Sequence, residues 1–143
     1  MATRREAREW CTQMLFQLDL NPTENINNAV TRFWVDKQPD SAMKEFAEKL
    51  LCGVRNNLIE IDNTIQKYAD NWHMDRMAAV DRNVMRMAVY EMLFCKDIPP
   101  IVSINEAVDI AKYFGSKESG RFVNGILDRI RKDIDRPARS KDE

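Results

Sequence analysis

The sequence has few of the residues that form turns, metal sites and disulfides. Of its 143 residues, four are glycine, five are proline, three are cysteine and one is histidine. So few glycines exclude a turn-rich β-sandwich and most phosphate-cradling loops. A single histidine excludes HExxH metalloproteases and zinc sites built on several histidines. We therefore expect a helical protein with no catalytic site, no metal and no cofactor.

Disulfides and membrane spans are also missing from the pattern. Cys11, Cys52 and Cys95 are odd in number and never form a CxxC pair, which argues against a disulfide framework and a zinc knuckle. No apolar run approaches the roughly 18 residues of a membrane span. The first ten residues are too charged for a signal peptide. The sequence predicts a soluble, cytoplasmic protein with reduced thiols.

The formal net charge of −1 hides an uneven distribution. Residues 1–10 carry three arginines against two glutamates, and residues 121–141 carry seven Lys or Arg against three Asp. Residues 11–120 carry twelve basic residues against sixteen acidic ones. Both ends of the chain are basic and the middle is acidic. If the two ends meet in space, they form a basic face that attracts nucleic acid.

Apolar residues recur at helical spacing along the chain, and no window alternates as a strand does. A Thr3/Glu6 capping box starts the first predicted helix, which ends at Asn21. The other predicted helices span about 26–34, 40–68, 75–95, 103–114 and 119–134, the fifth starting at a Ser103/Glu106 capping box. We predict a single all-α domain over residues 1–136, followed by a charged tail at 137–143.

Several residues of the first helix do not fit its apolar stripe. Phe16 projects about 160° from the stripe centre, so it either packs under a neighbouring helix or docks a partner protein. Arg4, Arg5 and Arg8 cluster at the helix start, where cations oppose the macrodipole. Folding alone does not favour them there. They are either a solvated face or a site for an anion such as RNA phosphate.

The last predicted helix carries a second candidate site. Phe122, Gly125 and Arg129 fall on one edge of its apolar stripe. The glycine leaves a notch in which an unstacked RNA base can lie on the phenyl ring, with Lys117 and Arg121 nearby. The alternative is close helix packing at Gly125 with Phe122 in the core.

One carboxylate lies among apolar residues of the central helix. Glu91 is either a functional group with a perturbed pKa or, as we predict, the partner of an arginine in a structural ion pair. No nucleophile, metal ligand or oxyanion donor is identifiable around it.

Three stretches carry the most specific pattern of the chain. They are Arg4-Arg5-Glu6-Ala7-Arg8-Glu9, Ala88-Val89-Tyr90-Glu91, and the run from Ser103-Ile104-Asn105-Glu106-Ala107 through Tyr113-Phe114-Gly115 to Arg121-Phe122-Val123-Asn124-Gly125-Ile126-Leu127-Asp128. Together they resemble the NusB family of bacterial transcription antitermination factors. The match spans the whole chain, although residues 20–60 match only in pattern.

The resemblance implies a bundle of about seven helices in two packed subdomains and a non-enzymatic function. NusB proteins pair with NusE, a ribosomal small-subunit protein, and the pair binds the single-stranded boxA element of nascent ribosomal RNA leaders. With the other Nus factors they make the elongating RNA polymerase resistant to termination. Whether the free protein is a monomer or a homodimer stays open at this point.

The resemblance also implies which residues bind each partner. The RNA-binding set comprises Arg4, Arg5, Arg8, Tyr68, Lys117, Glu118, Ser119, Arg121 and Phe122, to which the notch adds Gly125 and Arg129. The NusE-facing set comprises Phe16, Asp81, Arg82, Met85 and Arg86. Glu6 and Trp10 depart from members that carry a third consecutive arginine and a small residue there. We therefore expect weak RNA affinity without the partner.

Two rival functions fit part of the pattern. An RNA cytosine methyltransferase carries a NusB-like domain at its N-terminus, but its catalytic half is not among these 143 residues. A helical DNA-binding regulator is the other rival, because helices with basic ends can enter a major groove.

Overall fold

A computed structural model describes residues 3–134, and within that range the chain forms seven α-helices, one short 3-10 helix and no strand. The helices are α1 (Arg4–Leu20), α2 (Ile26–Trp34), α3 (Ser41–Asn56), α4 (Leu58–Tyr68), η1 (Met74–Arg76), α5 (Ala79–Phe94), α6 (Pro100–Phe114) and α7 (Lys117–Asp133). The all-α prediction is confirmed. The predicted tail at residues 137–143 lies outside the described residues.

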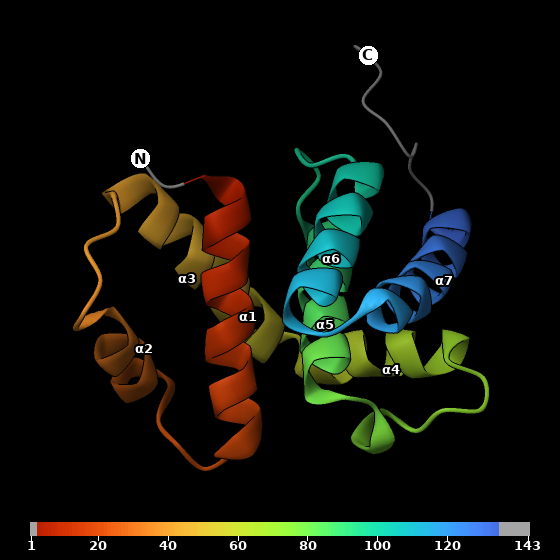
Figure 1. Ribbon diagram of the computed structural model, residues 1–143, viewed down its shortest axis with the longest axis horizontal. Coiled ribbons are helices and arrows are strands. Elements are labelled where there is room, and N and C mark those ends of the chain that lie inside the picture. The colour runs from red at the N-terminus through yellow and green to blue at the C-terminus, as the bar shows by residue number, and fades with distance from the viewer. Residues whose placement is uncertain (1–2, 135–143) are drawn as a thin grey trace.

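The helices form two packed groups (Figure 1). α1, α2 and α3 make one group, and α4 to α7 make the other around the central α5. α5 packs against helices of both groups, namely α1, α3, α4, α6 and α7. Its apolar residues cover most of its circumference, because a helix with neighbours on several sides must be apolar on each of them. The expected pair of subdomains is therefore present.

Three predicted helix boundaries are wrong. The helix predicted from 75 starts at Ala79, because residues 74–76 form the separate 3-10 helix η1. The long helix predicted from 40 to about 68 is two helices, which meet at Asn57. The Asn57 side chain donates to the backbone oxygen of Gly53 at 2.8 Å and so caps the end of α3. α6 starts at Pro100, a residue that suits a first helical turn. Ser103 therefore lies inside the helix and caps nothing.

The predicted start of α1 is correct. The Thr3 hydroxyl accepts a hydrogen bond from the Glu6 backbone N–H at 3.1 Å, as an N-cap does.

Within residues 3–134 no helix is both long and apolar enough to cross a membrane.

Candidate binding surfaces

The three arginines at the start of α1 lie in three different environments. Arg4 is exposed, and its guanidinium lies 4.8 Å from the ring centre of Phe46. Arg5 pairs with two carboxylates of α6, Glu106 and, at 3.0 Å, Asp109. Arg4 therefore differs from Arg5, because it forms no ion pair with a carboxylate among the described residues.

Arg8 requires a correction, because it is not on the surface. Its side chain is only 2% exposed, and Nε and Nη2 both donate to Glu91 at 2.8 Å. The Ser103 hydroxyl donates to the same carboxylate at 2.8 Å. Burial of this charge is compensated by bidentate pairing, as buried charges require. The structure removes Arg8 from the RNA-binding set and confirms Glu91 as the partner of an arginine.

Within residues 3–134, the basic start of α1 and the basic helix α7 do not form one continuous face. α1 lies on one side of α5 and α6, and α7 lies on the other (Figure 1). Among the described residues, the charge asymmetry therefore produces two separate basic regions, one at the start of α1 and one along α7.

The first turns of α7 present a polar surface. Lys117, Glu118 and Arg121 are exposed there. The Ser116 hydroxyl caps the helix by accepting from the Ser119 backbone N–H at 3.2 Å. Four of the predicted RNA-binding residues, at positions 117, 118, 119 and 121, are thus brought together on one turn.

Phe122, the residue after Arg121, is half-buried against an aromatic partner that the sequence did not reveal. Trp72 lies edge-to-face with it, at 6.0 Å between ring centres and an interplanar angle of 79°. The Trp72 side chain is 55% exposed. Both rings line a cleft of about 230 Å³ between α7 and the segment before α5. The signal available in the sequence was a tryptophan placed directly after the polar Asp70-Asn71 break, where the predicted helices are interrupted.

The loop that carries Trp72 is held in place from several directions. Asp70 has a positive φ of 36° and accepts a hydrogen bond from Arg129 at 2.7 Å. Arg129 also donates to the backbone oxygen of Tyr68 at 2.8 Å. Gln66 donates to the backbone oxygen of Trp72 at 2.6 Å and accepts from the Met74 backbone N–H at 3.0 Å.

Tyr68 and Arg129, both predicted to bind RNA, thus contribute to this support. The Tyr68 hydroxyl donates to Asp133 of α7 at 2.5 Å, which raises the pKa of the phenol. At Gly125 an added Cβ would meet nothing within 4 Å. Close helix packing is therefore not the reason for this glycine, and the notch beside Phe122 is open.

Asp81, predicted to face NusE, lines the cleft of Phe122 and Trp72 instead of the surface around Phe16. It is 8% exposed, and its Oδ1 has no hydrogen-bond partner among residues 3–134. Burial raises the pKa of this carboxyl, and an interaction with the Ser119 side chain offsets part of that rise.

Phe16 stands on a separate, apolar surface. It is 36% exposed and lines a groove of about 360 Å³ together with Val80 of α5 and Phe114 of α6. Thr12, Gln13 and Gln17 supply the polar edge of this groove. The neighbouring helices leave the ring accessible, so Phe16 remains a candidate partner contact.

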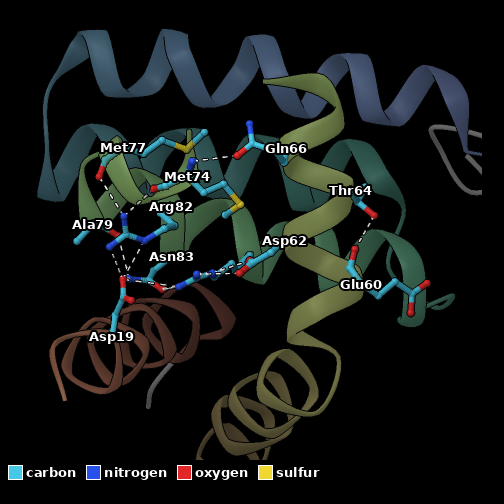
Figure 2. A network of polar contacts seen from close by, with 11 residues as sticks. Asp19, Glu60, Asp62, Thr64, Gln66, Met74, Met77, Ala79, Arg82 and Asn83 are labelled. Carbon is cyan, nitrogen blue, oxygen red and sulfur yellow. Dashed lines mark hydrogen bonds and ion pairs between the residues drawn. The ribbon is translucent and has the colours of Figure 1, made fainter. Parts of the chain in front are cut away.

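The remaining residues of the NusE-facing set lie largely inside the molecule. Arg82 donates to Asp19 at 2.6 and 3.0 Å and to the backbone oxygens of Met74 and Met77 at 2.7 and 3.2 Å (Figure 2). Arg82 thus ties α5 to α1 and to the segment that follows Trp72.

Arg86 makes a similar tie between helices. It holds both oxygens of Asp62 of α4, at 2.8 and 3.0 Å. Although burial opposes ionisation, Arg82 and Arg86 lower the pKa of Asp19. Met85 is fully buried, which corrects its prediction as a partner contact.

Comparison with known proteins decides the family. The model of the NusB family matches residues 5–132. The chain is 48% identical to the transcription antitermination protein NusB of Desulfatibacillum aliphaticivorans, over 91% of this chain and 90% of that protein. It is 43% identical to the same protein of Thermodesulfovibrio yellowstonii, over 91% and 92%. The chain belongs to the NusB family.

Solved structures of the NusB family share the fold. T. maritima NusB superposes with a TM-score of 0.85 at 42% identity, covering 92% of each chain. A chain from the crystal structure of antitermination factors NusB and NusE in complex with dsRNA superposes with a TM-score of 0.84 at 30% identity, covering 92% of this chain and 97% of that one.

Proposed function

We propose that this NusB-family protein is a transcription antitermination factor that binds boxA-type RNA as a heterodimer with NusE. The observation that carries the proposal is the match to antitermination proteins over nine-tenths of both chains. The fold shared with the NusB of a NusB–NusE–dsRNA complex supports both partners. The bound RNA and NusE then act on the elongating polymerase together with other Nus factors.

The RNA-binding surface of the proposal is the first two turns of α7 with the neighbouring cleft. Lys117 and Arg121 neutralise phosphates, which positions the strand without reading its sequence. Phe122 and Trp72 offer ring faces and edges to unstacked bases. Arg4, exposed at the start of α1, adds a phosphate contact from the second basic region.

The NusE-binding surface of the proposal is the apolar groove around Phe16. Its rings and aliphatic groups come from α1, α5 and α6. A half-exposed aromatic anchor in a groove is the usual centre of a protein interface. The groove is a different surface from the cleft, although Val80 and Asp81 are neighbours in α5.

The proposed function is non-enzymatic and cytoplasmic. The relatives named above are antitermination proteins matched over most of their own length. This favours antitermination over the methyltransferase-domain and DNA-regulator alternatives. A comparison of the affinities for single-stranded boxA RNA and for duplex DNA, measured at one salt concentration, separates an antitermination factor from a DNA-binding regulator.

Two substitutions test whether the two surfaces have separate functions. Phe122→Ala is expected to weaken binding of boxA-type RNA to the heterodimer by roughly 1–3 kcal/mol, because stacking on the ring is lost. It should leave NusE affinity unchanged. Phe16→Ala should do the reverse, weakening NusE binding measured by calorimetry without RNA. The proposal is wrong if wild-type protein with NusE does not prefer boxA-type RNA to an unrelated strand, or if both variants lose both affinities equally.

A further inference from the structure

The guanidinium of Arg4 lies on an aromatic ring of another helix. Its Cζ atom is 4.8 Å from the ring centre of Phe46, a residue of α3, and α3 packs against α1 (Figure 1). Within residues 3–134, Arg4 forms no ion pair with a carboxylate. A cation within about 6 Å of a ring centre is attracted by the electron-rich face of the ring. The Phe46 ring therefore holds the exposed Arg4 side chain beside α3.

The Phe46 ring is itself held in place by its surroundings. Arg8, one turn after Arg4 on α1, has its own guanidinium 5.4 Å from the centre of the same ring. The Arg8 side chain cannot move freely, because it is buried and donates through two nitrogens to Glu91. Phe46 is half-buried and packs against the hydrophobic core. The ring is thus in position before any ligand binds.

We propose that Phe46 is a positioning residue for RNA binding, because it orders the Arg4 side chain so that the guanidinium can contact an RNA phosphate. The inference rests on the proposed RNA-binding function and on the phosphate contact of Arg4. A guanidinium that stacks on a ring engages only its face, and the N–H donors along its edge stay free for a phosphate. Immobilising a long, rotating side chain on binding reduces affinity, and a side chain that is ordered beforehand avoids this loss.

The place of Arg4 in the fold favours this function over a purely structural one. Arg4 is the first residue of α1, where a cation opposes the helix macrodipole. Its guanidinium is exposed, so its contact with the Phe46 ring contributes little to the stability of the fold. A phosphate that binds there is favoured both by the guanidinium and by the positive end of the helix. The arrangement is therefore of more use to an anionic ligand than to the fold itself.

A double-mutant cycle tests the link between Phe46 and Arg4. The affinity of the full chain with NusE for boxA-type RNA is measured for wild type, Phe46→Leu, Arg4→Gln and the variant with both changes. Phe46→Leu keeps an apolar side chain and removes the ring, whereas Phe46→Tyr keeps the ring. Phe33→Leu is the matched control, because it removes a ring that also lies near a cation, Lys37, but on α2.

Phe46→Leu is expected to weaken RNA binding roughly two- to fivefold, the range for a cation on the ring of an exposed site. In the Arg4→Gln background the same substitution should leave the affinity unchanged, because the ring has no guanidinium left to order. Phe46→Tyr and Phe33→Leu should bind RNA as wild type does. The affinity of Phe46→Leu for NusE without RNA should equal that of wild type.

A measurement on the wild-type protein does not depend on how any variant folds. The NMR order parameter of the Arg4 Nε–Hε bond in the free full chain reports the motion of this side chain on the picosecond to nanosecond timescale. It should exceed the value for Arg121, an exposed arginine of α7. Equal disorder of the two side chains would mean that Phe46 does not order Arg4.

Several affinities would also overturn the inference. Phe46→Leu could bind RNA as wild type does, or lose the same factor with and without Arg4, in which case Phe46 acts only through the fold. Arg4→Gln could leave the RNA affinity unchanged, or Phe46→Tyr could bind as weakly as Phe46→Leu. In each of these cases the proposed function stands, because wild type still prefers boxA-type RNA. Loss of that preference by wild type would instead contradict the proposed function itself.

Discussion

At the scale of single residues, neighbouring arginines of one helix have different roles. Arg5 and Arg8 are three positions apart on α1, and both pair with carboxylates. Arg5 is partly exposed, where an ion pair contributes about 0–1 kcal/mol. Arg8 is buried with Glu91, where removing one partner leaves a charge without compensation. Burial, and not residue type, decides what each arginine contributes.

Substitution of these arginines by methionine should therefore give very different stabilities. Arg8→Met is expected to lower the free energy of unfolding by about 3–5 kcal/mol, because Glu91 loses its bidentate partner in the core. Arg5→Met should change it by about 1 kcal/mol or less. Denaturant titration followed by circular dichroism measures both. Similar losses for the two variants would mean that the Arg8–Glu91 pair is not a structural tie.

At the scale of elements, the two subdomains meet where helices approach closely. α3 crosses α5 at Gly53, where an added Cβ would lie 2.1 Å from Tyr90 Cζ. The Tyr90 ring is buried and stacks on Phe94 at 5.4 Å between ring centres. It cannot move aside freely. The missing side chain at Gly53 is therefore a condition for the packing of α3 on α5.

Alanine at two helical glycines tests this crossing. Gly53→Ala should destabilise the protein by roughly 1–3 kcal/mol, the usual cost of overpacking. Gly125→Ala is the matched control, since its Cβ would meet nothing within 4 Å, and it should stabilise α7 by roughly 0.5–1 kcal/mol. Thermal unfolding curves of both variants decide the matter. A stabilised Gly53→Ala protein would show that the Tyr90 ring yields without cost.

At the scale of the whole molecule, a net charge of −1 coexists with local basic surfaces. Many cations are neutralised internally, as Arg5, Arg8, Arg82 and Arg86 are by carboxylates of other helices. Within residues 3–134, the proposed RNA-binding surfaces carry the exposed cations Arg4, Lys117 and Arg121. Each of them can supply one phosphate contact.

The salt dependence of RNA binding should report these contacts one by one. Lys117→Gln and Arg121→Gln are each expected to reduce the slope of log affinity against log salt by about 0.7, the value for one phosphate contact on a single strand. Arg32→Gln is the control, because Arg32 is exposed on α2 and paired with Glu24. Slopes come from titrations of the heterodimer at several salt concentrations. An effect of Arg32→Gln as large as the others would show a nonspecific charge effect.

The sequence by itself determined the helical class and the central position of α5, because apolar periodicity reflects which faces are buried. Through resemblance it also identified the NusB family. It indicated Phe16 as a residue outside the apolar stripe and Glu91 as the partner of an arginine. These inferences succeed because they depend on neighbours along one helix or on a local mismatch of residue type and environment.

Tertiary structure alone decided which of the predicted residues are available to a partner. Arg8 and Met85 are enclosed, and Arg82 and Arg86 are engaged with Asp19 and Asp62, because helices distant in sequence cover them. Trp72 meets Phe122 and Asp81 only because a loop, a helix end and α7 come together in space. Periodicity locates a residue on a face of its own helix. The packing of the other helices determines whether that face is core, ion pair or binding surface.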